Sequence, residues 1–315
     1  MIKVWIIGAG PMAQDYIKVL DALKVSTNVI GRGKESAKSF EKKTGHNVMA
    51  GGLTLYLEAK PTICSHAIVA VPVEHLFNTT KQLLEYGVKN ILVEKPGALS
   101  NHEYEKLVQL SSTKNANLYV AYNRRFYASV IHAKKIITKD GGVTSFNFEF
   151  TEWGHIISSL FKGPGVKEKW FLSNSTHVVD LAFNICGPPK ELSSFTSGNL
   201  DWHPSASIFC GAGISLNGAL FNYSANWASA GRWSIEILTK KHKLILRPIE
   251  KLQIQKKGSI IESYVDDIDY DLDDKYKPGL YLQTEKFLKN NFNGMCSMAE
   301  QNKMLKIYNK IANYN

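Results

Sequence analysis

Short apolar runs alternate with amphipathic stretches along the first 120 residues of the chain. Candidates for buried strands lie at residues 4–7, 29–30, 48–49, 67–71, 91–93 and 118–121. Apolar side chains recur at helical spacing over residues 12–23, and the capping-box pair Ser100 and Glu103 predicts a helix over residues 101–114. Strands that alternate with helices are typical of βαβ units around a parallel sheet. The pattern therefore predicts a doubly wound α/β domain with a mainly parallel sheet over residues 1–123.

The periodicity changes in the second half of the chain. Three phenylalanines within residues 146–150 alternate with polar residues, and similar runs separated by turn signals follow over residues 191–264. An apolar helical stripe at residues 178–185 stops at a glycine and two prolines. These features predict an α+β domain with a large, mostly antiparallel open sheet over residues 124–315, whose C-terminal helix can pack back on the first domain. We expect the open sheet to pair subunits into a homodimer or homotetramer.

Composition and charge narrow the class of protein. The chain has 315 residues, of which 44% are hydrophobic and 21% charged, as in an ordinary globular protein. The first apolar run is too short for a signal peptide or a membrane span, so we expect a cytoplasmic protein with no membrane partner. The net charge of +10 comes from lysines scattered among acidic residues, which predicts no nucleic-acid partner but can attract an anionic cofactor or substrate. Cysteine spacing and the acidic run at residues 266–274 predict no metal site.

A glycine-rich turn follows the first predicted strand and opens the first predicted helix. Its residues match the G-x-G-x-x-A fingerprint: Gly8, Gly10, Pro11, Met12 and Ala13. Gly8 allows a tight turn, Gly10 lets the backbone approach a pyrophosphate, and Ala13 permits close packing of helix on strand. The anion then meets free amides at the positive end of the helix. The sequence therefore predicts a Rossmann domain that binds a nicotinamide dinucleotide.

The end of the second predicted strand bears on the choice of cofactor. An acidic residue there would hold the free ribose 2′-hydroxyl of NAD(H), but the chain has Arg32 between two glycines. Arg32 can form a charge-assisted fork with a 2′-phosphate and stack on adenine, and Lys34 adds positive charge. NADP(H) is therefore favoured, and NAD(H) stays possible. The alternative is a loop arginine that only faces solvent.

Two further strand ends are predicted to face the crevice where such sheets bind ligands. Val71 and Pro72, with His75 just beyond, follow the fourth strand. Glu94 and Lys95, with a proline after them, end the fifth strand. We expect these residues to contact the cofactor.

Four motifs together make the sequence resemble the Gfo/Idh/MocA family of glucose-fructose oxidoreductase, inositol dehydrogenase and related sugar oxidoreductases. They are the glycine turn at residues 8–13, Glu-Lys-Pro at 94–96, Tyr-Asn-Arg-Arg-Phe at 122–126 and Thr-His-Val-Val-Asp at 176–180. They occur in the family's order and approximate spacing and cover most of the chain. The resemblance implies an NAD(P)-dependent oxidoreductase that acts on CH–OH or C=O groups of a carbohydrate, such as a keto sugar or a nucleotide-linked sugar.

The resemblance also implies two catalytic residues. Lys95 would lie beside the nicotinamide and donate a hydrogen bond to the reacting sugar oxygen, where an ammonium stabilises a developing alkoxide. His177 would exchange the hydroxyl proton. The peptide bond that follows Lys95 can be cis, which would aim this side chain inward. The alternatives are a strand-end lysine that reaches solvent and an interior histidine with satisfied hydrogen bonds.

Further substrate contacts are expected from residues near these motifs. Asn123 and Arg124 follow the sixth strand, where an arginine can hold a phosphate or sugar hydroxyls, or can only bridge the domains. The same two alternatives apply to Arg125. Trp170 is a candidate for a sugar-stacking wall or a core residue. Asp180 lies one helical turn after the predicted catalytic histidine and can orient either the helix or the ring.

One position departs from the family pattern. The family usually has an aspartate four residues before the histidine, and this chain has Ser173 there, which we also expect near the substrate. A serine cannot act as a carboxylate base, so the proton relay must differ, use another group or be absent. This favours ketone reduction over dehydrogenation. It also keeps open a non-catalytic dinucleotide-binding sensor or regulator of the same fold, and the reduction of a non-carbohydrate such as an imine or a tetrapyrrole.

Overall fold

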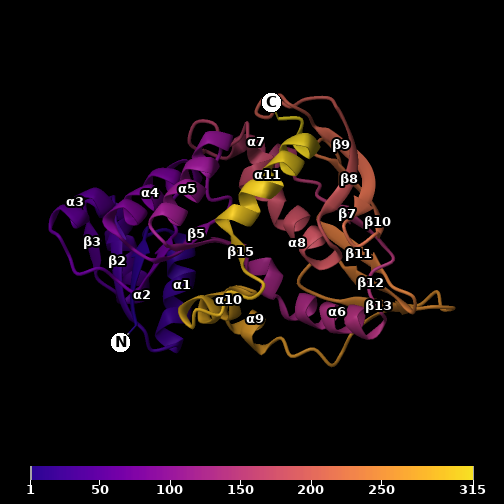
Figure 1. Cartoon of the computed structure of the whole chain (residues 1–315), viewed down its shortest axis with the longest axis horizontal. Helices are drawn as coiled ribbons and strands as arrows, with labels where there is room; N and C mark the ends of the chain where they lie inside the picture. Colours follow the sequence, from indigo (N-terminus) through magenta and orange to yellow (C-terminus); the bar gives the residue numbers. More distant parts are fainter. Residues whose placement is uncertain (1, 315) are drawn as a thin grey trace. The chain divides into compact units, whose positions relative to one another are not determined.

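The computed structural model describes residues 2–314, which form two compact units (Figure 1). The first unit comprises the described residues up to Asn123 together with Asp273–Met304. The second comprises Arg124–Leu272 and the described residues from Leu305 onward. Within residues 2–314 no helix combines the length and the apolar character that crossing a bilayer requires.

The first unit is built on a seven-stranded sheet in the order β15-β6-β5-β4-β1-β2-β3. Six strands pair in parallel: β1 (Lys3–Ile7), β2 (Ser26–Gly31), β3 (Val48–Ala50), β4 (His66–Val69), β5 (Asn90–Glu94) and β6 (Asn117–Ala121). Successive side chains of a strand point to opposite faces of the sheet. Val4, Trp5 and Ile6 have no exposed surface, so both faces of the sheet are covered at β1.

Helices connect these parallel strands, as the sequence pattern predicts. They are α1 (Pro11–Ala22), α2 (Lys34–Thr44), α3 (Gly52–Glu58), the 3-10 turn η1 (Val73–His75), α4 (Leu76–Tyr86) and α5 (Asn101–Thr113). The predicted capping box is present, since the Ser100 side chain accepts from the amide of Glu103 and the Glu103 carboxylate accepts from the amide of Ser100. The start of α5 is therefore fixed by local chemistry that is visible in the sequence.

The segment Asp273–Met304 lies in the first unit, whereas the sequence predicts residues 124–315 as the second domain, with a C-terminal helix that can pack back on the first. Helix α10 (Leu280–Leu288) packs on α1, and the Gln283 amide donates to the Tyr16 hydroxyl at 3.3 Å. Strand β15 (Cys296–Ser297) adds to β6 in antiparallel orientation. Helix α11 (Met298–Ala312) begins in the first unit and ends in the second. These contacts attach the segment to α1 and to the Rossmann sheet.

The second unit is built on an eight-stranded sheet in the order β14-β13-β12-β11-β7-β10-β9-β8. Its strands are β7 (Ser145–Glu149), β8 (Pro189–Ser197), β9 (Ile208–Ser215), β10 (Leu220–Asn226), β11 (Ser234–Leu238), β12 (His242–Leu246), β13 (Gln253–Lys256) and β14 (Glu262–Tyr264). The neighbours β7 and β10 are parallel, and the other neighbouring pairs are antiparallel. The predicted fold class, a Rossmann domain followed by an α+β domain with a mostly antiparallel sheet, is confirmed.

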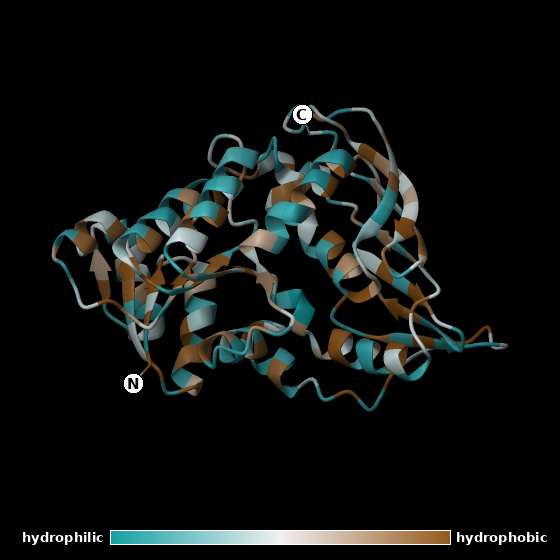
Figure 2. Ribbon diagram, viewed as in Figure 1, coloured by the Kyte–Doolittle hydropathy of each residue, from teal (hydrophilic) through white to brown (hydrophobic). Residues whose placement is uncertain are grey.

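One face of this sheet forms the core of the second unit. The helices are α6 (Ala128–Lys139), α7 (Gly154–Ser159) and α8 (Thr176–Cys186). Phe183 of α8 packs edge-on against Phe146 and Phe148, which are both buried. Exposed and buried positions alternate along β10, as the period of two requires, and Figure 2 shows both apolar and polar colours on the strands of this sheet. Other side chains of these strands point to the opposite face of the sheet. Among them, Phe195 is 67% and Leu220 is 60% exposed, so this face is partly apolar and uncovered within the unit.

Candidate functional site

The glycine turn between β1 and α1 has room for a ligand on one side and none on the other. Gly8 has φ +122°, and a Cβ atom there would lie 2.3 Å from the carbonyl oxygen of Ala70. A Cβ atom at Gly10 would meet no heavy atom within 4 Å. Ala13 is fully buried against the sheet. A side chain is therefore excluded at the first glycine by the protein, whereas the second borders open space.

The N-terminus of α1 offers unpaired amides to that space. Gly10 is its N-cap, no side chain caps the helix, and its first turn contains no acidic residue. Pro11 is the first helical residue and carries no N–H, so the amides of Met12 and Ala13 are the nearest donors. A helix N-terminus of this kind favours an anion. The turn therefore fits the pyrophosphate of a dinucleotide.

Residues that follow two other strands of the sheet, β2 and β4, come next. Arg32, just after β2, lies with its Nη1 atom 2.9 Å from Nε2 of His75 in η1. The guanidinium is a donor only, so it donates to the imidazole nitrogen and is held by it. Helix α2 begins two residues later without a side-chain cap. Val71 follows β4, and its amide nitrogen would lie 3.3 Å from a Cβ atom at Gly8. Pro72 is the N-cap of η1 and is exposed.

The Glu-Lys-Pro turn at the end of β5 adds two titratable residues to the same edge of the sheet. The peptide bond between Lys95 and Pro96 is cis. Glu94 accepts a hydrogen bond of 2.8 Å from the hydroxyl of Tyr16 in α1. Burial raises the pKa of Glu94, although the bond from Tyr16 and the charges of Lys95 and Lys277 act in the opposite direction. Burial also raises the pKa of Tyr16, so this phenol stays protonated and donates.

Lys277 belongs to this region of the first unit and was not predicted from the sequence. Its Nζ atom lies 2.8 Å from Sδ of Met12 and 3.7 Å from the carboxylate of Asp15. Asn123 contacts the same segment, because its side-chain amide donates to the carbonyl of Pro278 at 2.9 Å. No sequence motif marks Lys277, since the contact depends on the return of residues 273–304 to the Rossmann sheet.

In the second unit, His177 lies in the first turn of α8 and is 6% exposed. A π-helical turn, η3 (Phe171–Ser175), precedes it; such turns are frequent at functional sites. The Ser173 hydroxyl lies 3.0 Å from the carbonyl oxygen of Val166 and 2.9 Å from that of Lys169, so it can donate to the main chain just before this turn. Trp170 is buried and packs edge-on against Trp202 at 6.1 Å between ring centroids.

The two adjacent arginines of the Tyr-Asn-Arg-Arg-Phe motif have different partners. Arg125 forms a buried, two-pronged ion pair with Asp180, with Nε–Oδ2 of 2.8 Å and Nη2–Oδ1 of 2.5 Å. The Asp180 carboxylate is therefore bound by this guanidinium. Arg124 instead lies over the indole of Trp233, with 4.8 Å between its guanidinium carbon and the ring centroid.

The register of the second sheet explains how Trp233 reaches this region. Ser234 at the start of β11 pairs with Glu149 at the end of β7 in antiparallel register. The residues before β11 therefore lie beside those after β7. Arg232 lies 4.7 Å from the ring centroids of both Trp153 and Trp233. The sequence analysis did not single out Arg232 or Trp233.

Glu152 is a second carboxylate that the sequence analysis missed. Its side chain is 2% exposed, and it accepts hydrogen bonds from Asn174 at 2.9 Å and from Ser175 at 2.7 Å. Its other oxygen lies 3.6 Å from Nη1 of Arg232. Glu152 therefore ties the end of β7 to the turn that precedes the histidine helix.

Comparison with known proteins places the first unit. Residues 2–122 match the model of the Gfo/Idh/MocA family, described as an oxidoreductase family with an NAD-binding Rossmann fold. The resemblance predicted from the motifs is confirmed. A curated relative, a protein named as an oxidoreductase, YceM of Salmonella typhimurium, is 26% identical over 198 residues, which are 62% of this chain and 60% of the relative. The match thus spans less than two thirds of that relative.

Several solved structures share the fold over nearly the whole chain. The dehydrogenase MviM of Clostridium difficile has a TM-score of 0.79 at 21% identity, with 100% of this chain and 99% of that chain covered. A protein described as an NADPH-dependent oxidoreductase from Desulfitobacterium hafniense has a TM-score of 0.80 at 16% identity, with 99% of this chain and 95% of that chain covered. The UDP-N-acetylglucosamine 3-dehydrogenase GnnA of Acidithiobacillus ferrooxidans has a TM-score of 0.75 at 14% identity, with 99% of this chain and 97% of that chain covered. The fold of both units therefore agrees with the folds of these three solved structures.

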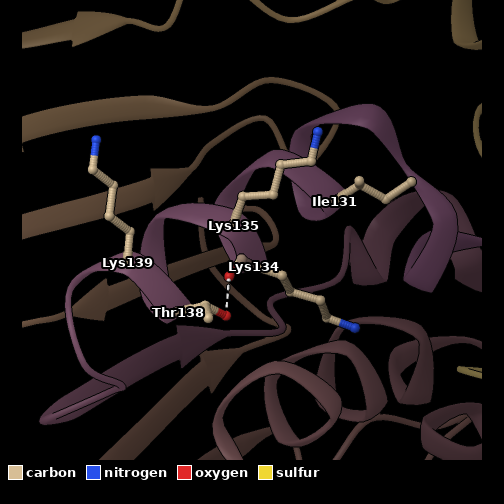
Figure 3. A pocket seen from close by; sticks show the side chains of 5 residues that line it. All are labelled: Ile131, Lys134, Lys135, Thr138 and Lys139. Atoms are coloured by element: carbon tan, nitrogen blue, oxygen red, sulfur yellow. Dashed lines mark hydrogen bonds between the residues drawn. The ribbon is translucent and has the colours of Figure 1, made fainter.

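A shallow depression on α6 lies apart from the motifs of the family (Figure 3). It is lined by Ile131, Lys134, Lys135, Thr138 and Lys139. Lys134 donates to the Asn184 side chain at 2.7 Å, and its ammonium group points away from that of Lys139 in Figure 3. The lysines do not converge on one point, so we assign no ligand to this depression.

Proposed function

We propose that the chain is an NADP(H)-dependent oxidoreductase that transfers a hydride between the nicotinamide and a carbohydrate, namely a keto sugar or a nucleotide-linked sugar. The observation that carries the proposal is the glycine turn, where the backbone excludes a side chain at Gly8 and leaves open space at Gly10 before an uncapped helix. The match of residues 2–122 to an NAD-binding oxidoreductase family supports it. So do similar structures described as a nucleotide-sugar dehydrogenase and an NADPH-dependent oxidoreductase.

The proposed preference for NADP(H) rests on Arg32. The imidazole of His75 fixes its guanidinium at the end of β2, and the uncapped start of α2 follows directly. A planar guanidinium and helix amides are both donors, which suits a 2′-phosphate better than a neutral hydroxyl. Val71, Pro72 and Glu94 are proposed to border the cofactor, since they follow neighbouring strands of the same sheet.

The bound cofactor would supply the hydride, and the chain would supply charge and protons. Lys95 is assigned to the reacting oxygen, where its ammonium stabilises the developing alkoxide. Glu94 beside it is anchored by Tyr16, which fixes the position of the turn from which Lys95 projects. His177 is assigned the exchange of the hydroxyl proton. Asn123, Arg124, Trp170 and Ser173 are the proposed neighbours of the substrate.

A fluorescence titration tests the cofactor assignment. Energy transfer from tryptophan to reduced nicotinamide would be followed as NADPH or NADH is added. We expect NADPH to bind about tenfold or more tightly than NADH, because a charge-assisted fork adds roughly 1.4 kcal/mol or more. Preference for NADH would remove the argument from Arg32, and the failure of both to bind would remove the proposed function.

The variant Lys95→Met tests the catalytic assignment. We expect turnover of keto sugars to fall by about 100-fold or more, because the side chain that stabilises negative charge is lost. The affinity for NADPH should stay nearly unchanged. Loss of cofactor binding with retained turnover would contradict the role given to Lys95.

A second candidate function is a dinucleotide-binding sensor or regulator without turnover. Ser173 favours it, because the family usually has an aspartate at this position, and the Ser173 hydroxyl here lies within hydrogen-bond distance of the main-chain carbonyls of Val166 and Lys169. A broad screen of sugars and keto sugars decides between the two functions. Cofactor oxidation or reduction with any of them would remove the second candidate.

We also propose that the uncovered sheet face of the second unit pairs subunits into a homodimer or homotetramer. Phe195 and Leu220 are the largest apolar side chains exposed on β8 and β10. Such a face is expected to be buried by association. Light scattering should give an oligomer for the wild type and a monomer for Leu220→Glu; a monomeric wild type would contradict the proposal.

A further inference from the structure

Two cations and an imidazole meet on one indole ring in the second unit. The guanidinium carbons of Arg124 and Arg232 lie 4.8 Å and 4.7 Å from the centroid of the Trp233 ring. The ring of His177 lies 6.3 Å from the same indole, centroid to centroid. Trp153 extends the stack beyond Arg232. We call these five residues the Trp233 cluster.

The charges in and around the Trp233 cluster do not cancel. Arg125 is neutralised by Asp180, and Arg232 has Glu152 at 3.6 Å. Arg124 forms no ion pair with any of residues 2–314, and its buried Nε atom has no hydrogen-bond acceptor among them. A buried donor without an acceptor is costly, and a native structure usually supplies one from water or a ligand. Counted together with Glu152, the cluster therefore carries one net positive charge, and it has an open donor on Arg124.

The stacking geometry leaves the arginine donors free for an anion. A guanidinium over an aromatic ring presents its face to the ring, so its N–H groups in the plane of the fork stay available. These groups only donate, and they match carboxylate or phosphate oxygens in a two-pronged arrangement. A neutral sugar hydroxyl would accept one bond but leave the charge uncompensated.

We propose that Arg124 and Arg232, which both lie over the Trp233 ring, bind an anionic group of the substrate, a carboxylate or a phosphate. The substrate is then an anionic carbohydrate whose charged group is anchored in the second unit next to His177. This inference rests on the proposed function, since it takes His177 to be near the substrate. It adds Arg232 and Trp233 as specificity-determining residues.

Binding of a matched set of polyols to the NADPH-saturated protein tests this inference. D-Glucitol is the neutral probe, D-gluconate replaces one of its terminal CH₂OH groups with a carboxylate, and D-glucitol 6-phosphate adds a phosphate. Calorimetric titration at fixed ionic strength should give at least one anion an affinity about tenfold or more above that of D-glucitol. Comparison of the two anions tells which group the cluster prefers.

Variants connect this selectivity to the cluster. Arg124→Gln should bring the affinity for the preferred anion down to that of D-glucitol while NADPH still binds as in the wild type. Arg232→Gln replaces the first variant if that variant fails to fold, because the Arg232 side chain is 50% exposed. It should cause a smaller loss of affinity for the preferred anion. Arg247→Gln is the matched control, because this arginine is exposed in the same unit and pairs with Glu236 outside the cluster.

Three results would overturn the inference. The first is equal affinity for charged and neutral probes, and the second is no binding of either anion. The third is a loss of anion affinity in Arg247→Gln that equals the loss in Arg124→Gln. The proposed function fails separately, by the absence of NADPH binding or of any turnover. A protein that binds NADPH and reduces a neutral keto sugar without favouring its anionic counterpart would retain the function and lose the inference.

Discussion

The glycine turn of the first unit and the Trp233 cluster of the second are both proposed to bind anions, but they are built differently. The turn uses main-chain amides within residues 8–13, and its shape depends on one glycine that lies against Ala70. The cluster uses side chains from residues 124, 153, 177, 232 and 233, and the pairing of β7 with β11 brings residues 232 and 233 beside residue 153. A site made by the backbone is continuous in the sequence, whereas a site made by side chains depends on the assembled sheet.

The largest effect should come from the ion pair beneath the cluster. Removing one partner of a buried, hydrogen-bonded pair leaves the other charge uncompensated and costs about 3–5 kcal/mol. We therefore expect Arg125→Met to lower the free energy of unfolding by about that amount, because Asp180 is left buried without its cation. Urea unfolding followed by tryptophan fluorescence would measure the change.

Arg124→Met is the control for this variant, since it changes the neighbouring arginine in the same way. Arg124 has no acidic partner among residues 2–314, so its loss should cost only about 1 kcal/mol from stacking. Equal losses in the two variants would show that the contrast between the arginines is wrong.

The glycine turn should respond to a single methyl group. In Gly8→Ala the new Cβ atom would lie 2.3 Å from a carbonyl oxygen, at a φ of +122° that side chains rarely adopt. We expect NADPH to bind about 100-fold more weakly, with a loss of stability of about 1–3 kcal/mol. The titration with NADPH and a thermal melt measure the two effects.

Gly10→Ala separates binding from folding at the same turn. A Cβ atom there meets no protein atom within 4 Å, so the melting temperature should stay near that of the wild type. NADPH affinity should still fall, because the methyl group occupies the space proposed for the pyrophosphate. Unchanged affinity in this variant would contradict the backbone approach that the glycine fingerprint implies.

The same contrast explains what the sequence could predict. The parallel strands and the glycine turn were predictable because their signals are local: short apolar runs, a fingerprint of six residues and a capping box. Strand β15 has two residues, too few to show any period, and the bond between Gln283 and Tyr16 joins residues far apart in the chain. The sequence therefore predicts only that a C-terminal helix can pack back on the first domain, and not that residues 273–304 add a strand and α10 to the first unit.

The candidate site divides in the same way. The motifs that contain Lys95, Arg124 and His177 carried the resemblance to the family, so these residues were predicted as site residues. Arg232 and Trp233 lie in a loop before β11 with no motif of their own. The contact of Arg232 with Trp153 depends on the pairing of β11 with β7, two strands far apart in the chain, and no local sequence pattern encodes that pairing.

The Arg32 variant tests whether side chains matter in the backbone-built site. In Arg32→Ser the donor fork that His75 holds is lost, so NADPH affinity should fall about tenfold while NADH affinity changes little. The ratio of the two dissociation constants is the quantity to measure. An equal fall for both cofactors would assign Arg32 to the shape of the turn and not to the 2′-phosphate.

The smallest effect concerns a buried carboxylate of the second unit outside the cluster. Asp140 accepts bonds of 2.7 Å from His242 and from Thr239. Burial alone would raise the pKa of Asp140, but these bonds outweigh it, so the pKa lies below its ordinary value of 3.8. The unfolded chain then takes up the proton more readily than the folded one. This carboxylate therefore stabilises the fold above about pH 4 and loses that effect as the pH falls through its folded pKa.

The variant Asp140→Asn should accordingly be less stable than the wild type by about 1 kcal/mol at pH 6, and the difference should shrink below pH 4. Asp267→Asn is the matched control, because Asp267 is 80% exposed and lies 3.8 Å from His132, so its pair is weakened by solvent. Urea unfolding between pH 3 and pH 6 measures both variants. A difference for Asp140→Asn that does not change with pH would mean that the shape of this side chain, and not its charge, stabilises this part of the second unit. Side-chain charge would then matter less in the second unit, which would narrow its contrast with the glycine turn that the backbone of the first unit forms.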